Sequence, residues 1–552
     1  MKNPQLKNIA FRKVTLTLSI MAVLLAACSK KEMASSYMAE SSANVASVQA
    51  VAADSTAKMV APAPSPTSVY GTEENTEKYQ KTETNSVKSV GQEPVSTFSI
   101  DVDTGSYTNV RRFLNEGSLS PKDAVRVEEM VNYFDYQYPN PTSAHPFSVN
   151  TETVDSPWQA NAKVIRIGIK AKDIDSKQLP PANLVFLVDI SGSMGDQNKL
   201  PLVKKTLKLL TEQLRAQDQV TLITYADGEK MVIEPTLGSN KSKILAAIDT
   251  LQAGGATAGE QAIQMAYKSA QKSFVKNGIN RILLATDGDF NVGITDFDTL
   301  KNMVAEKRKS GISLSAFGYG SGNYDEQLME QLADAGDGNY SYIDNEKEAK
   351  KVLQRQLSST LVTVAQDVKI QVEFNPATVK EYRLIGYENR MLKNEDFNND
   401  KVDAGDIGAG HTVTALYEII PVGQKGWLSD SRYANATALG KNAKEYAFVN
   451  LRYKQPGQSQ SILLSQPIAV GSKALNQASA DTRFALAVAA YGQQLRSPEY
   501  NAAMQWNDII DLAQSAQKQD AFGLRAEFVD LIKKAKKLSS NQPIQKTINK
   551  SQ

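Results

Sequence analysis

The sequence predicts an α/β fold: a doubly wound, mostly parallel sheet inserted in a β-sandwich-like domain, followed by a helical C-terminal region. Three observations predict this architecture. Over residues 182–360, short apolar strands alternate with amphipathic helices, which is typical of parallel α/β domains. Segments with a two-residue period, typical of antiparallel strands, stand on both sides of that region, around 147–172 and over 365–470. From Asp481 onward, apolar residues recur at helical spacing.

The N-terminus has the pattern of a lipoprotein signal peptide. Four basic residues precede the apolar stretch VTLTLSIMAVLLAA, which is too short for a comfortable membrane span. The stretch ends in LAAC at Cys28, which resembles the bacterial lipobox, where cleavage precedes a cysteine that then receives lipid. We therefore expect removal of residues 1–27 and lipidation of Cys28, palmitate included. Ser29 favours sorting to the outer membrane. The alternative is a plain signal peptide with an incidental cysteine.

Residues 28–91 are predicted to form a disordered tether. They are rich in Ser, Ala, Thr, Glu and Pro and have little hydrophobic periodicity. As a random coil, such a segment would span roughly 45 Å on average, enough to hold a folded body away from a membrane.

The N-terminal flanking region, residues 92–181, is predicted to mix helices with strands. A short strand at STFSI leads into a helix over 107–115, and a second helix is expected to begin at Pro121, because proline suits the first helical turn. The alternation in KVIRIGIKAK, residues 163–172, predicts a strand.

The remaining boundaries follow from changes in period. The α/β domain is expected to span 182–360, with strands at NLVFLVDI, DQVTLITYAD, RILLATDGD, ISLSAFGYG and NYSYI and four amphipathic helices between them. Five segments of two-residue period predict a β-sandwich-like domain over 361–475. Residues 476–552 are expected to be helical.

Oxygen-bearing side chains gather where the strands of the α/β domain end. Asp189, Ser191 and Ser193 follow the first strand, Thr257 lies in the loop GGATAGE, and Asp287 ends the strand RILLATDGD. Ligands of doubly wound sheets bind at the carboxyl ends of the strands, so these five residues are predicted to meet there. Two carboxylates and three hydroxyls favour Mg²⁺, with Mn²⁺ or Ca²⁺ also possible, over Zn²⁺.

These motifs resemble a known site. The DxSxS sequence, the Thr257 loop and the TDG sequence resemble the metal-ion-dependent adhesion site of von Willebrand factor type A (VWA) domains, which have a Rossmann-like fold. The resemblance implies that Ser191, Ser193 and Thr257 are direct or near-direct ligands, and that Asp189 and Asp287 bind directly or through water. The flanking sequences resemble bacterial lipoproteins that carry this domain.

Two side features accompany the resemblance. Glu260 stands where many relatives have glycine; we expect it to face solvent. Met194, Phe290 and Asn291 are expected on the rim of the site.

Composition and histidine content argue against other functions. The 62 Lys and Arg residues nearly balance 60 Asp and Glu residues, which argues against nucleic-acid binding, and a single cysteine excludes an intrachain disulfide or thiolate cluster. The segment around Ser191 and Ser193 is one residue away from a G-x-S-x-G nucleophile elbow, but the histidines, His145 and His411, lie outside the α/β region. A serine hydrolase is therefore the least favoured reading.

Charged residues outside the strand ends are expected to be structural. Asp101 and Asp103 are predicted to support a turn, while Arg111 and Arg112 are predicted to face solvent.

The sequence thus predicts a lipid-anchored protein of the bacterial cell envelope and not an enzyme. Its α/β domain would bind a divalent cation, and an acidic side chain from an unknown protein partner would complete the coordination of that cation. It would contact the membrane through the lipid on Cys28 and would bind no nucleic acid. The alternative is an envelope scaffold in which the metal only stabilises the domain.

Overall fold

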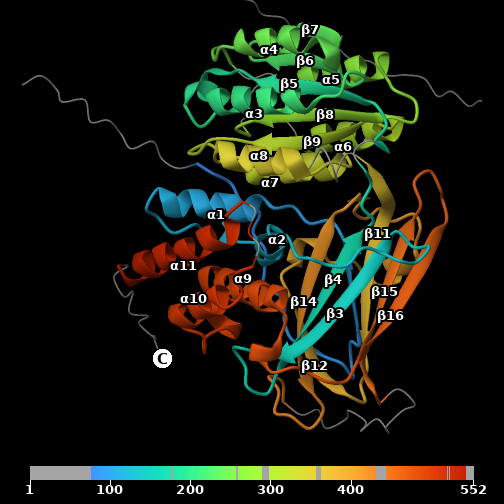
Figure 1. The fold of residues 1–552 in the computed structure, drawn as a ribbon, viewed down its shortest axis with the longest axis vertical. Coiled ribbons are helices and arrows are strands. Elements are labelled where there is room, and N and C mark those ends of the chain that lie inside the picture. The colour runs from blue at the N-terminus through green and yellow to red at the C-terminus, as the bar shows by residue number, and fades with distance from the viewer. Residues whose placement is uncertain are drawn as a thin grey trace, which may run out of the picture. The chain divides into compact units, whose positions relative to one another are not determined.

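The α/β domain is a six-stranded sheet with helices on both faces (Figure 1). The computed structural model describes residues 76–175, 178–256, 259–288, 297–355, 362–429, 443–518, 520 and 522–541. The strands of this sheet are β5 (Ala182–Asp189), β6 (Gln219–Tyr225), β7 (Glu229–Leu237), β8 (Ile279–Thr286), β9 (Ser313–Gly318) and β10 (Tyr340–Tyr342). Its helices are α3 (Leu200–Gln213), α4 (Lys241–Asp249), α5 (Gly259–Lys272), α6 (Phe297–Lys307), α7 (Glu326–Ala335) and α8 (Glu346–Arg355).

The strand order, β10-β9-β8-β5-β6-β7, is parallel except for the edge strand β7. The central strand β5 is buried throughout, because alternate side chains enter opposite cores. Leu184 and Phe186 pack in the core that includes α3, α4 and α8, whereas Val185 and Leu187 pack with α5, α6 and α7. This explains why β5 reads as a continuous apolar run. The predicted doubly wound sheet is confirmed, although the antiparallel β7 and the helices α4 and α8 were not anticipated.

The β domain consists of two sheets that share one core. One sheet has the order β1-β12-β14-β4-β3, and the other has the order β13-β11-β15-β16 with β2 also paired to β11. The strands are β1 (Lys88–Ser89), β2 (Val95–Ser99), β3 (Phe147–Asp155), β4 (Lys163–Ala171), β11 (Thr363–Phe374), β12 (Val379–Ile385), β13 (Ile407–Gly408), β14 (Thr412–Pro421), β15 (Glu445–Lys454) and β16 (Ser461–Ala469). Ile167 of β4 and Val449 of β15 belong to the same buried cluster.

The α/β domain is inserted into this β domain. Strand β4, which precedes the insertion, pairs along its length with β14, which follows it, from Lys163 opposite Ile419 to Lys170 opposite Thr412. The predicted pairing across the insertion is therefore confirmed.

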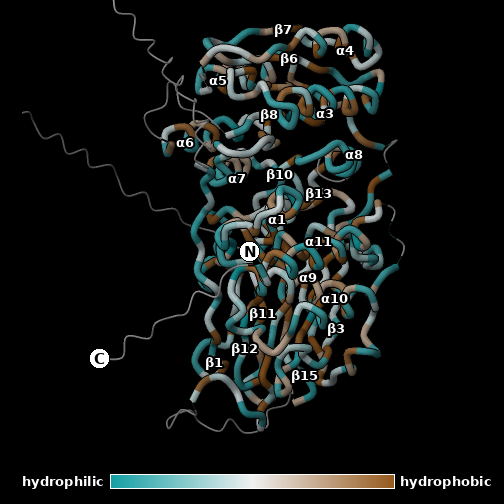
Figure 2. The backbone as a smooth tube through the Cα atoms, turned by 90° about the vertical axis from the view of Figure 1, so that its left-hand side faces the viewer, coloured by the Kyte–Doolittle hydropathy of each residue, from teal (hydrophilic) through white to brown (hydrophobic). Residues whose placement is uncertain are grey.

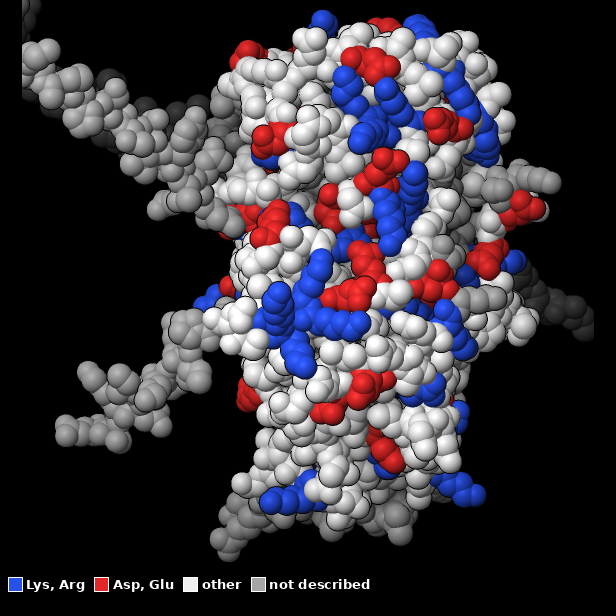
Figure 3. All heavy atoms as spheres, turned by 60° about the vertical axis from the view of Figure 1, so that its left-hand side comes forward, with Lys and Arg blue, Asp and Glu red and all other residues white. Residues whose placement is uncertain are grey.

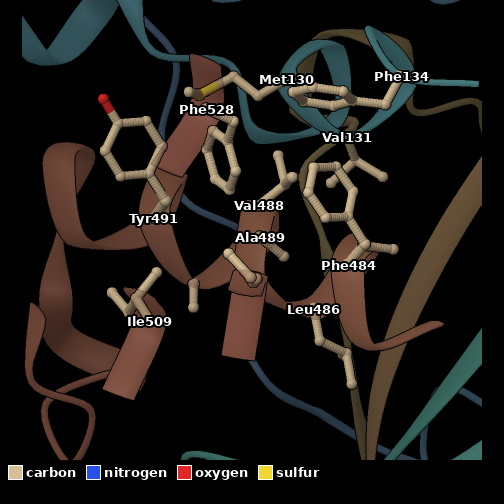
Figure 4. Packing of buried hydrophobic residues seen from close by; sticks show 14 of the residues in the cluster. Met130, Val131, Phe134, Phe484, Leu486, Val488, Ala489, Tyr491, Ile509 and Phe528 are labelled. Atoms are coloured by element: carbon tan, nitrogen blue, oxygen red, sulfur yellow. The ribbon is translucent and has the colours of Figure 1, made fainter. Parts of the chain in front are cut away.

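Helices from both ends of the chain form one further layer. They are α1 (Gly105–Asn115), α2 (Val127–Asn132), α9 (Ala480–Arg496), α10 (Trp506–Gln514) and α11 (Leu524–Ser540). Figure 4 shows Phe134 of the N-terminal flank beside Phe484 and Phe528 of the C-terminal helices. The centroid of the Phe134 ring is 4.8 Å from that of Phe484 and 5.5 Å from that of Phe528. Helix α8 is largely hydrophilic (Figure 2). In the described part of the chain, every helix is too short or too polar to cross a membrane.

Two local expectations for the N-terminal flank are corrected. The second helix begins at Val127 and not at Pro121, because a 3₁₀ turn (Lys122–Ala124) is followed by extended backbone at Arg126. The expected tether is also too long at its C-terminal end. Residues 76–78 bond to the loop before α7, and β1 pairs with β12, so the segment from Thr76 onward is part of the folded body.

Arg111 and Arg112, expected in solvent, are buried instead. The Arg111 side chain is 1% exposed and joins α1 to the α/β domain, with its Nη2 atom 2.5 Å from Asp344 and 2.8 Å from Glu348. Arg112 lies 2.8 Å from Glu77 and stacks on the Phe113 ring. The face of α1 that the sequence predicts to be exposed to solvent is thus an interface, because its arginines pair with carboxylates of segments distant in sequence.

Two more buried arginines of the flanking regions bind α7. Arg126 pairs with Glu129 beside it, and its Nη2 atom is 2.5 Å from Glu326. Arg390, which follows β12, lies 2.9 Å from Glu330 of the same helix.

The expected turn residues Asp101 and Asp103 take part in this contact. The Arg390 guanidinium lies 2.9 Å from Asp103, 3.5 Å from Asp101 and 2.6 Å from Asp334. Carboxylates therefore outnumber guanidinium groups in the interface, and burial raises the pKa of Glu326 to about 8 and that of Asp334 to about 7.

Replacing Glu326 by glutamine is expected to flatten the dependence of stability on pH. Because the pKa of Glu326 rises from 4.5 to about 8 on folding, the folded state holds the extra proton between those values, and stability falls as pH rises through that window. The free energy of unfolding of the wild type should therefore fall more steeply than that of Glu326→Gln, by up to about 1.4 kcal/mol per pH unit.

Chemical denaturation between pH 5 and pH 8 measures both slopes. Glu306→Gln, an exposed change on α6, is the matched control and should keep the wild-type slope. Equal slopes for wild type and Glu326→Gln would contradict a raised pKa of Glu326 in the folded protein.

Candidate metal centre

The DxSxS turn leaves the sheet at the carboxyl end of its central strand. Asp189 is the last residue of β5 and is fully buried, and a 3₁₀ turn (Gly192–Gly195) follows at once. The Asp189 Oδ1 atom accepts a hydrogen bond from the Ser191 backbone N–H at 2.9 Å, which folds the turn back over the strand end. The Oγ atoms of Ser191 and Ser193 lie 3.1 Å apart. Three predicted ligands are thus brought together.

The Thr257 loop approaches this turn, although Thr257 itself lies outside the described residues. The Gly254 N–H donates to the Ile190 carbonyl at 2.7 Å, and the Gly192 N–H donates to the Gly255 carbonyl at 2.9 Å. Two backbone hydrogen bonds therefore join the turn of Ser191 and Ser193 to the GGATAGE loop. Phe290 and Asn291 of the expected rim and Cys28 also lie outside the described residues.

Asp189 is a buried carboxylate surrounded by neutral donors. Its Oδ2 atom accepts from the Thr286 hydroxyl at 2.8 Å, in addition to the Ser191 contact. Among the described residues, no lysine, arginine or histidine forms an ion pair with it. Burial, with the nearby charge of Asp287, raises the pKa of Asp189 to about 6, although the hydrogen bonds from Ser191 oppose that shift. A buried carboxylate beside two hydroxyls offers the oxygen donors that a hard divalent cation requires.

Asp287, one position after β8, has a different environment. Its Oδ2 atom accepts from Lys199 Nζ at 3.0 Å and from Asn323 Nδ2 at 3.0 Å, and Lys199 Nζ also donates to Asn323 Oδ1 at 2.9 Å. Asp287 is fully buried and Lys199 is 4% exposed. The lysine thus neutralises one of the two carboxylates of the site, which leaves Asp189 as the one that lacks a described cationic partner.

Lys199, Asn323 and Thr286 were not predicted from the sequence. Thr286 could have been found, because it immediately precedes Asp287 in the TDG motif. Lys199 stands next to the start of α3, and Asn323 lies far along the chain, so neither position carries a local signal. One further expectation is corrected: Met194 is fully buried in the core beside α3 and is not exposed on a rim. Glu260 is partly exposed and accepts a solvent-exposed hydrogen bond from Gln264.

The first described residues of the chain bond to the loop that carries Asn323. The Thr76 N–H donates to the Gly322 carbonyl at 2.8 Å, and the Gly322 N–H donates to the Glu77 carboxylate at 2.8 Å. Lys78 pairs with Asp325 at 3.1 Å on the same loop. Residues 76–78 therefore support the loop of Asn323, and Asn323 donates a hydrogen bond to the predicted metal ligand Asp287.

The two histidines stand in the β domain. His145 Nδ1 lies 2.9 Å from the Tyr453 hydroxyl of β15, and His411 immediately precedes β14.

Three family models match the chain. A model described as von Willebrand factor type A domain matches residues 183–356, one described as von Willebrand factor matches 73–166, and one described as uncharacterized protein YfbK, C-terminal, matches 359–538.

Similar proteins match over different extents. The uncharacterized protein YfbK of Escherichia coli K12 is 49% identical over 469 residues, which cover 83% of this chain and 81% of that protein. Human inter-alpha-trypsin inhibitor heavy chain H4 is 30% identical over 161 residues, 28% of this chain and 17% of that one. A solved structure, von Willebrand factor type A from Catenulispora acidiphila, aligns with a TM-score of 0.40 at 15% identity, over 72% of this chain and 92% of that one.

Removing the charge of Lys199 is expected to destabilise the protein in the absence of metal. Lys199→Met leaves the fully buried Asp287 carboxylate without its ammonium partner, which should lower the free energy of unfolding by about 3 kcal/mol. Denaturant titration in the presence of a chelator measures the change.

The double variant Lys199→Met with Asp287→Asn should recover most of that loss, because neither charge remains. Lys309→Met, which removes an exposed lysine, is the matched control and should change stability by less than about 0.5 kcal/mol. A single variant as stable as the wild type would show that the ion pair contributes nothing.

Proposed function

The chain belongs to the same bacterial family as YfbK of Escherichia coli, in which a VWA domain is combined with the YfbK C-terminal domain, and on this premise we propose that it is a lipid-anchored envelope protein that binds a protein partner through a divalent cation. Asp189, Ser191, Ser193, Thr257 and Asp287 would hold the ion, preferably Mg²⁺. When bound, the cation would supply an electrophilic position for a carboxylate of the partner.

The observation that carries the proposal is the contrast between the two buried carboxylates. Asp287 is already paired with Lys199, whereas Asp189 receives only neutral hydrogen bonds among the described residues and lies beside two converging hydroxyls. A divalent cation would compensate the buried charge of Asp189 and would use the hydroxyl oxygens that point toward each other.

Binding is favoured over catalysis by the positions of the histidines. A serine nucleophile needs a neighbouring base, and both histidines belong to the β domain. Binding of nucleic acid is not favoured either, because basic and acidic side chains are interspersed on the face shown in Figure 3, without a continuous basic stripe.

A titration with Mn²⁺ or Mg²⁺ tests the metal site directly. The full-length wild type is expected to bind the ion, and Asp189→Asn should weaken binding more than about tenfold, because it removes a charged ligand. Isothermal calorimetry measures the affinity. Asp530→Asn is the matched control, since it removes an exposed carboxylate on α11, far along the chain from the predicted ligands. Identical titrations of wild type and Asp189→Asn would overturn the site.

Partner capture separates adhesion from the scaffold alternative. In the adhesive reading, proteins retained from cell envelopes by the wild type are lost with chelator and with Asp189→Asn. In the scaffold reading, metal raises the melting temperature while retention is the same in all three samples.

The anchor is tested at Cys28. Cys28→Ser is expected to abolish incorporation of labelled palmitate and to release the protein from the membrane fraction, because the thiol is the atom that accepts lipid. Ser29→Ala keeps the thiol and should remain lipidated. A wild-type chain that takes up no label would favour the incidental cysteine instead.

A further inference from the structure

We propose that a groove beside α3 binds an acidic segment of the partner that also carries apolar side chains. We call it the α3 groove; it encloses about 430 Å³ between one face of α3 and residues 251–253, which follow α4. The inference rests on the proposed function and specifies the chemistry of the partner.

The α3 groove is continuous with the loops of the candidate metal centre. One end is formed by Met194 and Gly195, which follow directly after Ser193. The wall at residues 251–253 leads into Gly254, whose N–H bonds to the Ile190 carbonyl beside Asp189. An extended segment that placed one side chain at the metal centre could therefore continue along the groove without leaving the surface.

Lysines define the α3 wall. Lys204, Lys205 and Lys208 line the groove, and their spacing places them on one face of the helix, together with Pro201 one turn earlier. Lys205 is exposed. Lys204 Nζ donates to the carbonyl oxygens of Asp249 and Leu251, at 2.9 and 3.1 Å. Those bonds hold the opposite wall in place.

Lys208 pairs with the Asp249 carboxylate at 2.5 Å, and that carboxylate also interacts electrostatically with Lys204. Glu346, which pairs with Lys350, interacts with Lys205, so three lysines of the groove stand against two neighbouring carboxylates. The groove thus presents net positive charge next to a site for a divalent cation. Both features attract carboxylates and repel basic segments, so charge complementarity selects an acidic occupant.

The floor of the groove is apolar. Leu200, Pro201 and Leu251 line the groove between the lysines. The two leucines are 3% and 5% exposed and Pro201 is half-buried, so the apolar surface that a ligand could cover is small and lies mainly at Pro201. A purely acidic segment would leave this surface uncovered, whereas one with interspersed apolar side chains would bury it. The lysines and the apolar residues of the lining are together complementary to an acidic protein segment that also carries apolar side chains.

Labelled synthetic peptides test the inference on the full-length protein. Fluorescence anisotropy in Mg²⁺ compares four peptides of equal length: aspartate with leucine, aspartate with serine, asparagine with leucine, and lysine with leucine. The aspartate–leucine peptide is expected to bind at least about tenfold more tightly than each of the others. Equal binding of all four would overturn the inference.

Two charge substitutions at one position of the groove are expected to change peptide binding in opposite directions. Ala253 is exposed on the wall opposite the lysines. Ala253→Glu should weaken binding of the aspartate–leucine peptide and Ala253→Lys should strengthen it, each several-fold. Lys205→Gln should also weaken it, and Lys537→Gln on α11 is the matched control that should not. Binding that is unchanged by both Ala253 variants and by Lys205→Gln would overturn the inference.

Failure of this inference can be told apart from failure of the proposed function. Mn²⁺ binding that is lost in Asp189→Asn but retained in Lys205→Gln and Ala253→Glu supports the metal site independently of the groove. If the wild type binds no Mn²⁺, the proposed function fails, and peptide binding that still follows the Ala253 variants then supports an acidic docking groove alone.

Discussion

The arrangement of this protein depends on buried arginines that join the α/β domain to the regions flanking it in sequence. Arg111, Arg126 and Arg390 come from the flanks and end on carboxylates of α7, α8 and the turn before α8. A guanidinium buried this deeply is tolerated only when it is paired and hydrogen-bonded, so the contacts define one relative placement of the segments. Because carboxylates are in excess, some of them hold protons, and the interface is linked to pH. Apolar packing builds each core, while these charges hold the cores to one another.

The same physical rule organises the candidate metal centre. Two aspartates at the ends of neighbouring parallel strands are fully buried, but their hydrogen-bond and ion-pair partners differ. Asp287 is compensated by Lys199 within the protein, whereas Asp189 is surrounded by hydroxyl and backbone donors. The pKa of Asp189 rises because burial outweighs its hydrogen bonds. A divalent cation would compensate the buried charge of Asp189, the carboxylate of the site that no described lysine, arginine or histidine pairs with.

The N-terminal segment connects this centre to the rest of the chain. Residues 76–78 pair with the loop that carries Asn323, and Glu77 reaches both that loop and Arg112 of α1. The segment that follows the predicted lipidation motif in sequence thus contacts both the loop of Asn323, which supports Asp287, and the helical layer. The loop before α7 is held from both sides: by the N-terminal segment on one side and by Lys199 on the other.

The sequence by itself determined the fold class and the central part of the candidate site, and tertiary structure decided the rest. A two-residue period predicted β4 and β14, and a short apolar run between helices predicted β5, because both patterns are local properties of a strand. The DxSxS and TDG motifs were readable because parallel strands bring their carboxyl ends together. The burial of Arg111 and the roles of Lys199 and Asn323 were not readable, because each depends on a partner more than thirty positions away. A charged residue looks the same in sequence whether it faces water or a distant carboxylate, and only the folded chain distinguishes the two.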